Sequence, residues 1–536
     1  MSRFYVTTTI PYVNARPHLG FALELVQADV LARRARQAGR EVRFLTGTDD
    51  NSLKNVLAAE AEGVPVQDLV DRNAAAFAGL RAPLALSFDD FIRTSSDPRH
   101  RIGVERLWER VAASGDLYRK HYEGLYCVGC EQFYTSDELT GDGLCAEHLT
   151  RPRRVAEENW FFRLSRYGDR LRELIAGGTL RIELAARRNE VLALIDSGLH
   201  DFSVSRSQRR ARGWGIPVPG DPDQVVYVWW DALGNYVTSL GYGTAAPDVE
   251  RWWGPERPPG TADGASTSTT TGTSTGTGTG TGRDTAAGRR RVHLAGKGVL
   301  RFHAVYWPAM LLSAGLPLPT DVLVHDYLTV DGRKISKSAG TAVDPAELAA
   351  EVGTDAVRWW LLRDVPRVGD ADYTRERLVA RADGDLAGGL GNVVHRIVTM
   401  VHSYRGGRVP EPAGHQPSPL PELADACAAA GGRIDAALEA FDFRRATAAV
   451  WSIVEEANRA VEATRPWESA RAERGGDTAA GARLDAVLAA LHRGCAELAV
   501  AVEPFLPGAA ARIAAQVTPV GGELPPAGPL FPRIGA

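Results

Sequence analysis

Cysteine is scarce in this sequence, and long apolar runs are missing from it. Five cysteines in 536 residues do not make the disulfide framework of a secreted domain, so we expect a reducing compartment, the cytoplasm. No run of about eighteen apolar residues occurs, which excludes a membrane-spanning helix. No charged-then-apolar leader opens the chain. We therefore expect a soluble protein that is not exported and has no membrane partner.

The sequence also lacks an excess of either charge, and it contains very little lysine. Lys+Arg 62 against Asp+Glu 66 gives a net charge of -4, which excludes a general polyanion binder and limits any nucleic-acid contact to a local basic patch. Lysine is a compact point charge that the planar guanidinium of arginine does not replace. We therefore interpret the close pair 334/337 as functional and Lys120 as chance retention. The lysines are Lys54, Lys120, Lys297, Lys334 and Lys337.

The opening of the chain is typical of an α/β nucleotide-binding unit. A length of 536 residues exceeds the roughly 250–300 at which a single core stops growing, so we expect several domains. The pattern predicts a strand at 4–9, a Pro/Asn loop at 10–18, a helix at 19–38 and a strand at 41–46. This order places the end of the loop at a helix N-terminus, where backbone N–H groups favour phosphate. The unit alone does not define a reaction.

The rest of the chain divides into blocks of different composition. Residues 116–223 carry three cysteines and short strand-like runs, and such runs return at 224–230 and 322–330. Residues 264–282 are Gly, Ser or Thr except for Ala265, so we expect a flexible loop. From 386 onward, alanine-rich helical periodicity predicts an all-α bundle. Its candidate helices cover residues 388–404, 421–439, 443–463 and 478–502.

A cysteine- and histidine-rich segment predicts a metal site. Cys127 and Cys130 form one close pair, and Cys145 and His148 form a second after a fourteen-residue loop. Two pairs of soft ligands at this spacing suit one tetrahedral zinc ion, and four protein ligands leave no position for water, so the site should be structural. A redox CxxC motif is the competing interpretation, and incidental core cysteines are the simplest one.

Two further motifs resemble the paired signatures of class I aminoacyl-tRNA synthetases. His18-Leu-Gly-Phe21 stands where the first helix begins, and Lys334-Ile-Ser-Lys-Ser338 follows a predicted strand and turn. By itself a histidine at a helix start is more often a packing or capping residue. Together the segments resemble the His-x-Gly-His and Lys-Met-Ser-Lys-Ser motifs of that class. The wider chain, apart from residues 257–291, is similar to the methionyl-tRNA synthetase family in its short form.

The resemblance implies an α/β fold of defined layout. This is the Rossmann-type nucleotide-binding fold of class I synthetases, with an inserted zinc-binding connective domain and a C-terminal α-helical bundle. The catalytic domain would have two halves, at 1–115 and 224–340, and the second half would contain the insert 257–291. The connective insertion 116–223, with its zinc knuckle at 127–148, would separate the two halves. A linking region at 341–385 would lead to an anticodon-binding domain at 386–536.

The resemblance also implies a reaction. The enzyme would attach methionine to tRNA(Met) with ATP, through a methionyl-adenylate, and would use Mg²⁺ with ATP and one structural Zn²⁺ per chain. No protein nucleophile is needed, so positioning and charge stabilisation should carry the rate. Because no further module follows the helical domain, we expect a monomer.

The functional positions of the family map onto this sequence in groups. The catalytic positions are His18, Lys334 and Lys337. The ATP-binding positions are His18, Gly20, Phe21, Lys297, His325, Lys334, Ser336 and Lys337. The methionine-binding positions are Ile10, Tyr12, Asp49, Trp229, Ala232, Tyr236, Val299, His303 and Trp307, where aromatic walls suit a thioether and Asp49 is placed to accept the ammonium. The anticodon-reading positions are Asn392, Arg396 and Trp467, with a core tryptophan and a surface arginine as the simpler interpretation.

The sequence departs from the family pattern at several of these places. Phe21 replaces the second signature histidine, and losing one transition-state donor can cost about 2.7–4 kcal/mol. Leu233 replaces a common proline, Ile335 replaces methionine, and Asp326 stands where glycine is usual. We expect an active enzyme with an altered pocket that is less sensitive to inhibitors mimicking methionine.

Two other functions remain open at this point. One is a synthetase for another amino acid, such as a cysteinyl-type enzyme whose zinc binds the substrate thiol, although four ligands within 127–148 leave no vacancy. The other is a paralogue that has lost catalysis and acts as a tRNA-binding or regulatory module. Phe21 favours that paralogue, and the retained pair Lys334 and Lys337 argues against it.

Overall fold

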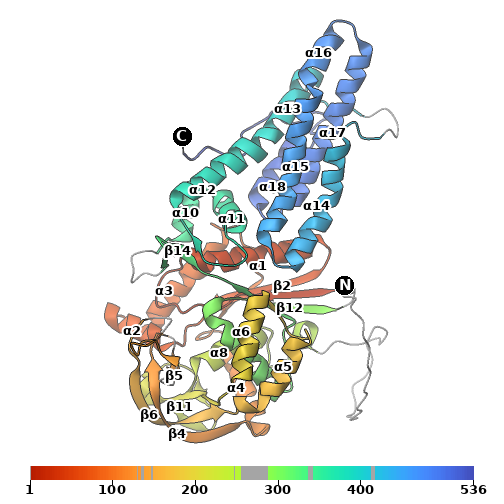
Figure 1. The fold of residues 1–536 in the computed structure, drawn as a ribbon. Helices are drawn as coiled ribbons and strands as arrows, with labels where there is room; N and C mark the ends of the chain where they lie inside the picture. The colour runs from red at the N-terminus through yellow and green to blue at the C-terminus, as the bar shows by residue number, and fades with distance from the viewer. Residues whose placement is uncertain are drawn as a thin grey trace, which may run out of the picture.

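A six-stranded, wholly parallel sheet forms the centre of the molecule (Figure 1). The computed structural model describes residues 2–129, 131–134, 138–145, 149–246, 248–254, 288–335, 342–411 and 417–535. In spatial order the strands are β3 (Asp90–Arg93), β2 (Glu41–Thr48), β1 (Arg3–Thr7), β12 (Arg289–Gly296), β13 (Asp321–His325) and β7 (Arg181–Glu183).

The sheet is buried on both faces because its strands alternate between two cores. In β1, Phe4 and Val6 point into one core and Tyr5 points into the other. The first core contains α1 (Leu19–Gln37), and the second contains α4 (Pro98–Ala113) and α8 (Val228–Thr238). The helix predicted at 19–38 and the strands predicted at 4–9 and 41–46 therefore exist, with ends shifted by one or two residues.

Smaller helices surround the sheet. They are α2 (Leu53–Glu62), α3 (Val66–Ala78), α5 (Gly168–Ala176), α6 (Ala185–Asp196), α7 (Gln208–Ala211) and α9 (Trp307–Ser313), with the short helices η1 (Gly79–Arg81), η3 (Leu164–Tyr167), η4 (Val249–Trp253), η5 (Lys297–Val299) and η6 (Phe302–Tyr306).

The block 116–223 forms two small antiparallel sheets beside the central one (Figure 1). It also supplies β7 to the edge of the central sheet, so the block is not wholly separate from it. One sheet has the order β5 (Gln132–Tyr134), β4 (Leu117–Cys127), β6 (Arg153–Phe162) and β8 (Phe202–Ser203), and the other has the order β10 (Pro217–Val218), β11 (Asp221–Val226) and β9 (Ser205–Ser207).

The strand-like run predicted at 224–230 is wrong in its second half. Strand β11 ends at Val226, and helix α8 begins at Val228. A short run of apolar residues that is buried on every side has no periodicity to separate helix from strand. Asp231 lies in the first turn of α8, where a carboxylate interacts favourably with the helix N-terminus.

After β13 the chain forms a linking region and then a helical bundle. The linking region contains the small sheet β15 (Arg333–Lys334), β14 (Leu328–Val330) and β16 (Ala371–Asp372), and helices α10 (Pro345–Val352), α11 (Thr354–Arg363) and α12 (Arg375–Arg381). The bundle contains η7 (Ala382–Gly391), α13 (Asn392–Arg405), α14 (Pro421–Glu439), α15 (Phe443–Thr464), α16 (Pro466–Arg474), α17 (Thr478–Val502) and α18 (Pro507–Val517). The four predicted bundle helices are present; α16 and α18 are additional.

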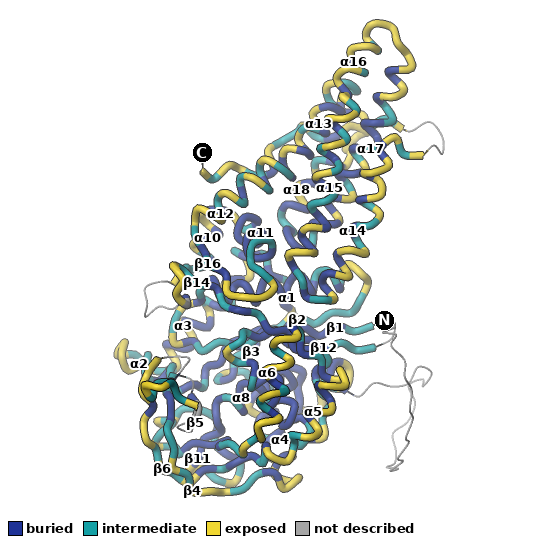
Figure 2. The backbone as a smooth tube through the Cα atoms, viewed as in Figure 1, coloured by how far each residue is buried: buried dark blue, intermediate teal, exposed yellow. Residues whose placement is uncertain are grey.

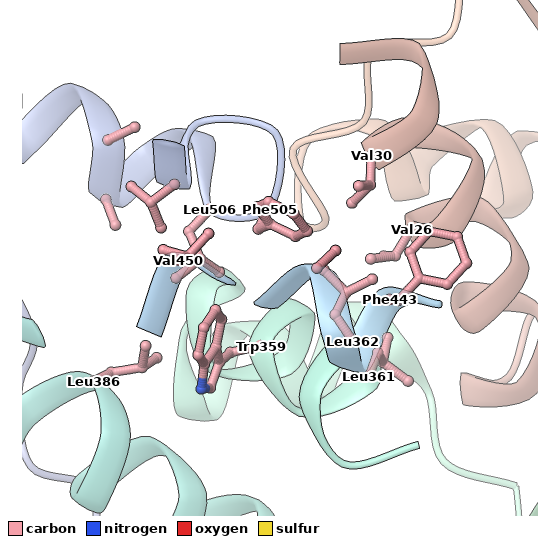
Figure 3. Packing of buried hydrophobic residues seen from close by; sticks show 14 of the residues in the cluster. Val26, Val30, Trp359, Leu361, Leu362, Leu386, Phe443, Val450, Phe505 and Leu506 are labelled. Carbon is pink, nitrogen blue, oxygen red and sulfur yellow. The ribbon is translucent and has the colours of Figure 1, made fainter. Parts of the chain in front are cut away.

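The bundle and the sheet share one continuous core. Side chains of α1, α11, α15 and the turn before α18 meet in it (Figure 3), and Figure 2 shows burial running without interruption from the sheet into the bundle. At the junction the fully buried guanidinium of Arg358 pairs with Asp29 of α1 at 2.8 Å. It also donates to the carbonyls of Leu84, Pro504 and Phe505. In the described part of the chain, no helix combines the length and apolarity needed to cross a bilayer.

Candidate active site

A cavity of about 840 Å³ opens at the carboxyl ends of the central strands. The connection after β1 leads to β2 and the connection after β12 leads to β13, in opposite directions along the sheet. The switch point between these two neighbouring strands is where open α/β sheets bind ligands. Eight of the nine predicted methionine-binding residues line the cavity: Ile10, Tyr12, Asp49, Trp229, Ala232, Tyr236, Val299 and His303. The structure thus brings together residues that are almost 300 positions apart in sequence.

The ninth residue, Trp307, lies behind the cavity wall. Its side chain is fully buried, and its ring centre is 5.9 Å from that of Tyr236. The Trp307 indole N–H donates to Nε2 of His293 at 3.2 Å, so the proton of this imidazole resides on Nδ1 and faces Thr7 Oγ1 at 2.7 Å. Burial lowers the pKa of His293 well below its usual value. Trp307 therefore supports the wall without contributing to its surface.

Asp49 has an unsatisfied buried oxygen at the cavity. Its side chain is 2% exposed, and Oδ1 has no hydrogen-bond partner within the described residues. Burial, and then the charges of Asp231 and Glu131, raise the pKa of Asp49 well above its usual value. The backbone of Tyr12 forms an isolated β-bridge with that of Asp49. The Tyr12 hydroxyl is likewise buried and has no hydrogen-bond partner among the described residues. A cationic donor such as an ammonium would supply hydrogen bonds to these two buried oxygens.

His303 contributes a neutral imidazole. Its Nδ1–H donates to the carbonyl of Val299 at 2.9 Å, and its Nε2 accepts from the hydroxyl of Tyr236 at 2.7 Å. Burial lowers the pKa of His303, in agreement with this uncharged tautomer. Nearby, the indole of Trp229 is stacked on Phe302 with ring centres 3.7 Å apart. The far wall is thus aromatic and uncharged, which suits an apolar side chain.

A smaller cavity of about 210 Å³ adjoins the first at the start of α1. His18 is the N-cap of α1, and its Nδ1 accepts the amide of Gly20 at 3.2 Å. A Cβ at position 20 would stand 3.0 Å from this ring, so glycine allows the close approach. Phe21 is buried against Phe77 in an edge-on contact and presents an apolar surface to the cavity.

A charged pair closes the other side of the smaller cavity. His325 donates from Nε2 to Glu24 at 2.8 Å and from Nδ1 to the carbonyl of Asp326 at 2.9 Å. Because the carbonyl and the carboxylate are both acceptors, this arrangement favours the imidazolium form of the ring. Burial opposes this charge, but the hydrogen bond and charge of Glu24 prevail and raise the pKa of His325. Glu24 also accepts from the hydroxyl of Thr9 at 2.7 Å. Sequence reasoning missed Glu24, although an acid within the apolar run of α1 was a usable signal.

The remaining predicted ATP residues are only partly described. Lys297 lines the main cavity, and its ammonium lies 2.6 Å from the carboxylate of Asp370. The backbone of Lys334 belongs to β15, and its side chain is not among the described parts of the structure. Ser336 and Lys337 lie outside the described residues.

The positions that depart from the family pattern lie close to the two cavities. Leu233 lines the main cavity, and Ile335, like Phe21, lines the smaller one. Asp326 is buried outside both cavities, where it accepts from Arg187 and from the amide of Gly369.

The structure describes two of the four predicted zinc ligands. Cys127 and Cys145 are both buried and pack around Tyr134 in a small separate cluster. Cys130 and His148 lie outside the described residues. Among the residues that are described, no group of three or more His, Cys, Asp or Glu side chains is arranged to hold a metal ion. The buried thiols of Cys127, at the end of β4, and Cys145, in a later loop, nevertheless supply half of the expected donor set.

The predicted anticodon residues lie on the surface of the bundle. Asn392 is exposed at the start of α13, and Arg396, one turn later, pairs with Glu462 at 2.8 Å. Glu462 lies near the end of α15, five positions before Trp467. The Trp467 side chain is 38% exposed, so it is not a core residue.

The comparisons with known proteins agree on one family. The family model described as tRNA synthetases class I (M) matches residues 4–155, 142–260 and 285–398. The methionine–tRNA ligase of Brucella suis is 36% identical over 99% of this chain and 98% of its own length. The corresponding protein of Mycobacterium tuberculosis is 37% identical over the same shares.

Solved structures give the same result. The methionyl-tRNA synthetase of Mycobacterium tuberculosis in complex with methionyl-adenylate has a TM-score of 0.86 at 36% identity, covering 99% of this chain and 100% of the other. Its apo form has a TM-score of 0.81 at 34% identity, with coverages of 99% and 98%. The chain therefore belongs to the methionyl-tRNA synthetase family of class I tRNA synthetases.

Proposed function

We propose that this chain attaches methionine to tRNA(Met) at the expense of ATP. The observation that carries the proposal is the unsatisfied carboxylate oxygen of Asp49 in a cavity that also has an aromatic and aliphatic wall. Asp49 would bind the ammonium of the amino acid, and the slot formed by Tyr236, Trp229 and Val299 would hold the thioether. In this orientation the substrate carboxylate would face the adjoining smaller cavity.

In the first step, the methionine carboxylate attacks the α-phosphorus of ATP, and pyrophosphate leaves with the electrons of the broken P–O bond. The N-terminus of α1 and the Nε2–H of His18 would stabilise negative charge on the phosphates. Lys337, supported by Lys334, would neutralise the charge that develops on pyrophosphate. Mg²⁺ bound to ATP supplies further charge neutralisation.

In the second step, a hydroxyl of the terminal tRNA ribose attacks the methionyl carbonyl, and AMP leaves. We assign tRNA selection to Asn392, Arg396 and Trp467. An exposed indole offers a stacking surface for an unpaired base, and the amide and guanidinium offer hydrogen bonds to its edge.

Zinc would have a structural role in this enzyme. Cys127, Cys130, Cys145 and His148 would hold it as a closed tetrahedral site. Metal analysis of the purified protein tests this role, with Cys145→Ala expected to lose the ion and Cys495→Ala, in the bundle, expected to retain it. We place the enzyme in the reducing cytoplasm, in keeping with the small number of cysteines in its sequence.

Methionine-dependent exchange between ATP and pyrophosphate tests the proposal directly. Exchange with methionine, and none with leucine or cysteine, is the expected result. A folded, zinc-loaded protein without exchange would instead support the tRNA-binding paralogue.

A further inference from the structure

Four charged side chains form a network beside the main cavity, although they come from four separate segments of the chain. They are Arg187 of α6, Lys297 of η5, Asp326 after β13 and Asp370 before β16. Lys297 is the member that lines the cavity. Two members are cations and two are anions, so the loss of one charge leaves another unbalanced.

The ammonium of Lys297 is paired with both anions. It donates to Oδ1 of Asp370 at 2.6 Å, and Oδ1 of Asp326 lies 3.8 Å away, within the range of an ion pair. Burial opposes ionisation of Asp370, but the hydrogen bond from Lys297 prevails and lowers the pKa of this carboxyl. An ammonium has three N–H donors, so Lys297 can bind a phosphate in the cavity while its bond to Asp370 persists.

The carboxylate of Asp326 is itself held in place. Its side chain is 4% exposed, Arg187 donates to Oδ1, and the amide of Gly369 donates to Oδ2 at 2.7 Å. Arg187 is held in turn by Glu190, one turn further along α6, at 2.9 Å. A carboxylate restrained by so many contacts presents its charge to Lys297 at a fixed position.

The main chain of Asp326 serves the smaller cavity. Its carbonyl accepts from Nδ1 of His325 at 2.9 Å, and His325 lines that cavity. Asp326 thus has two separable contacts, a carbonyl that orients His325 and a carboxylate that faces Lys297. A substitution of the side chain removes only the second contact.

We propose that Asp326 is a positioning residue, which holds the ammonium of Lys297 where the triphosphate of ATP binds. Gly298, next to Lys297, lines both cavities, so the lysine stands near their junction. A lysine binds phosphate as a point charge, and the strength of that interaction depends on the position of the charge. Asp326 would therefore contribute to ATP binding without touching the nucleotide. The inference rests on the proposed function, because only its first step brings a triphosphate to this place.

The variant Asp326→Asn tests the inference, since it removes the charge and keeps an oxygen that can accept from the amide of Gly369. In methionine-dependent ATP–pyrophosphate exchange, the KM for ATP should rise by about tenfold, whereas the KM for methionine should stay the same. Arg187→Ala, which removes the anchor of the Asp326 carboxylate, should shift the KM for ATP in the same direction. Arg188→Ala is the matched control, because this exposed neighbour on α6 forms no ion pair with any described residue.

A second set of variants shows whether the effect passes through Lys297. In a Lys297→Ala background, Asp326→Asn should leave the KM for ATP unchanged, because the charge that Asp326 positions is absent. Asp370→Asn should behave in the same two ways. This variant should also fold normally, since the side chain of Asp370 is 40% exposed.

An unchanged KM for ATP in Asp326→Asn would overturn the proposal. Effects of Asp326→Asn and Lys297→Ala that multiply in the double variant would show that Asp326 does not act through Lys297. Equal increases in both KM values, together with a lower thermal midpoint, would indicate a purely structural ion pair between α6 and the end of β13. Failure of the unmodified protein to catalyse exchange would instead overturn the proposed function itself.

Discussion

The substitution Asp49→Asn removes one negative charge from the cavity wall and keeps the shape of the side chain. Asp49 is buried, and its Oδ1 has no described partner, so a substrate ammonium would form a charge-assisted hydrogen bond there. Such a bond contributes about 1.5–3 kcal/mol, which corresponds to roughly a 10- to 150-fold change in a binding constant. We expect the KM for methionine to rise by this factor.

The assay is ATP–pyrophosphate exchange at varied methionine, with the deaminated analogue of methionine as a competing ligand. The intact protein should bind the analogue more weakly than methionine by the factor that Asp49→Asn costs. The variant should bind the two ligands equally. An unchanged KM for methionine, or a variant that still discriminates against the analogue, would refute the assignment of Asp49.

The substitution Asp49→Asn should weaken methionine binding but should not lower the stability of the ligand-free protein. Burial, with Asp231 and Glu131, raises the pKa of Asp49 in the folded state, so folding favours its protonated form. The free energy of unfolding therefore falls as pH rises from the unfolded-state pKa towards the folded-state pKa. At neutral pH the ligand-free variant should be at least as stable as the unmodified protein, and in strong acid the difference should vanish. Thermal unfolding across pH measures this, and a variant that is less stable at neutral pH would contradict it.

Four other perturbations have defined outcomes. Lys337→Ala should slow adenylate formation, followed by rapid-quench pyrophosphate release, and leave methionine affinity nearly unchanged; lost affinity with unaltered chemistry would contradict its role. Tyr236→Phe leaves Nε2 of His303 without its donor and should lower the free energy of unfolding in urea by about 1–3 kcal/mol, whereas no change would mean that another donor replaces it. Arg358→Leu leaves buried Asp29 without one of its partners and three carbonyls without donors, so a loss of about 3–5 kcal/mol is expected in the same assay, and an unchanged midpoint would disprove that role. Deletion of residues 258–288 should leave aminoacylation unchanged, and reduced activity would show that the segment is not a passive loop.

Much of the helical bundle was predictable from the sequence. The helices predicted at 421–439 and 478–502 have those bounds, and the one predicted at 443–463 ends one residue later. An amphipathic helix carries its signal within its own residues, because apolar side chains recur every three or four positions. The run at 224–230 had no such signal, and the helix α8 that begins within it buries Asp231 in hydrogen bonds with His100 and Asn51, which are distant in the sequence.

Part of the candidate site was predictable as well, but only as separate motifs. The resemblance identified Asp49, His18 and the aromatic residues of the cavity, and the structure gathers most of them around one space. It did not identify Glu24 or His293, whose partners His325 and Trp307 come from distant segments. It also placed Trp307 at the cavity, whereas packing places it behind the wall.

The sequence by itself therefore determined the family, most helices of the bundle and the residue types that the chemistry needs. These properties are local, since they depend on periodicity and on motif spacing. Only the tertiary structure decided which oxygen of Asp49 lacks a described partner and which groups form hydrogen bonds with the rings of His303 and His325. Such properties depend on burial and on contacts between residues far apart in the chain, because the strength of an electrostatic interaction is set by the surroundings that folding creates.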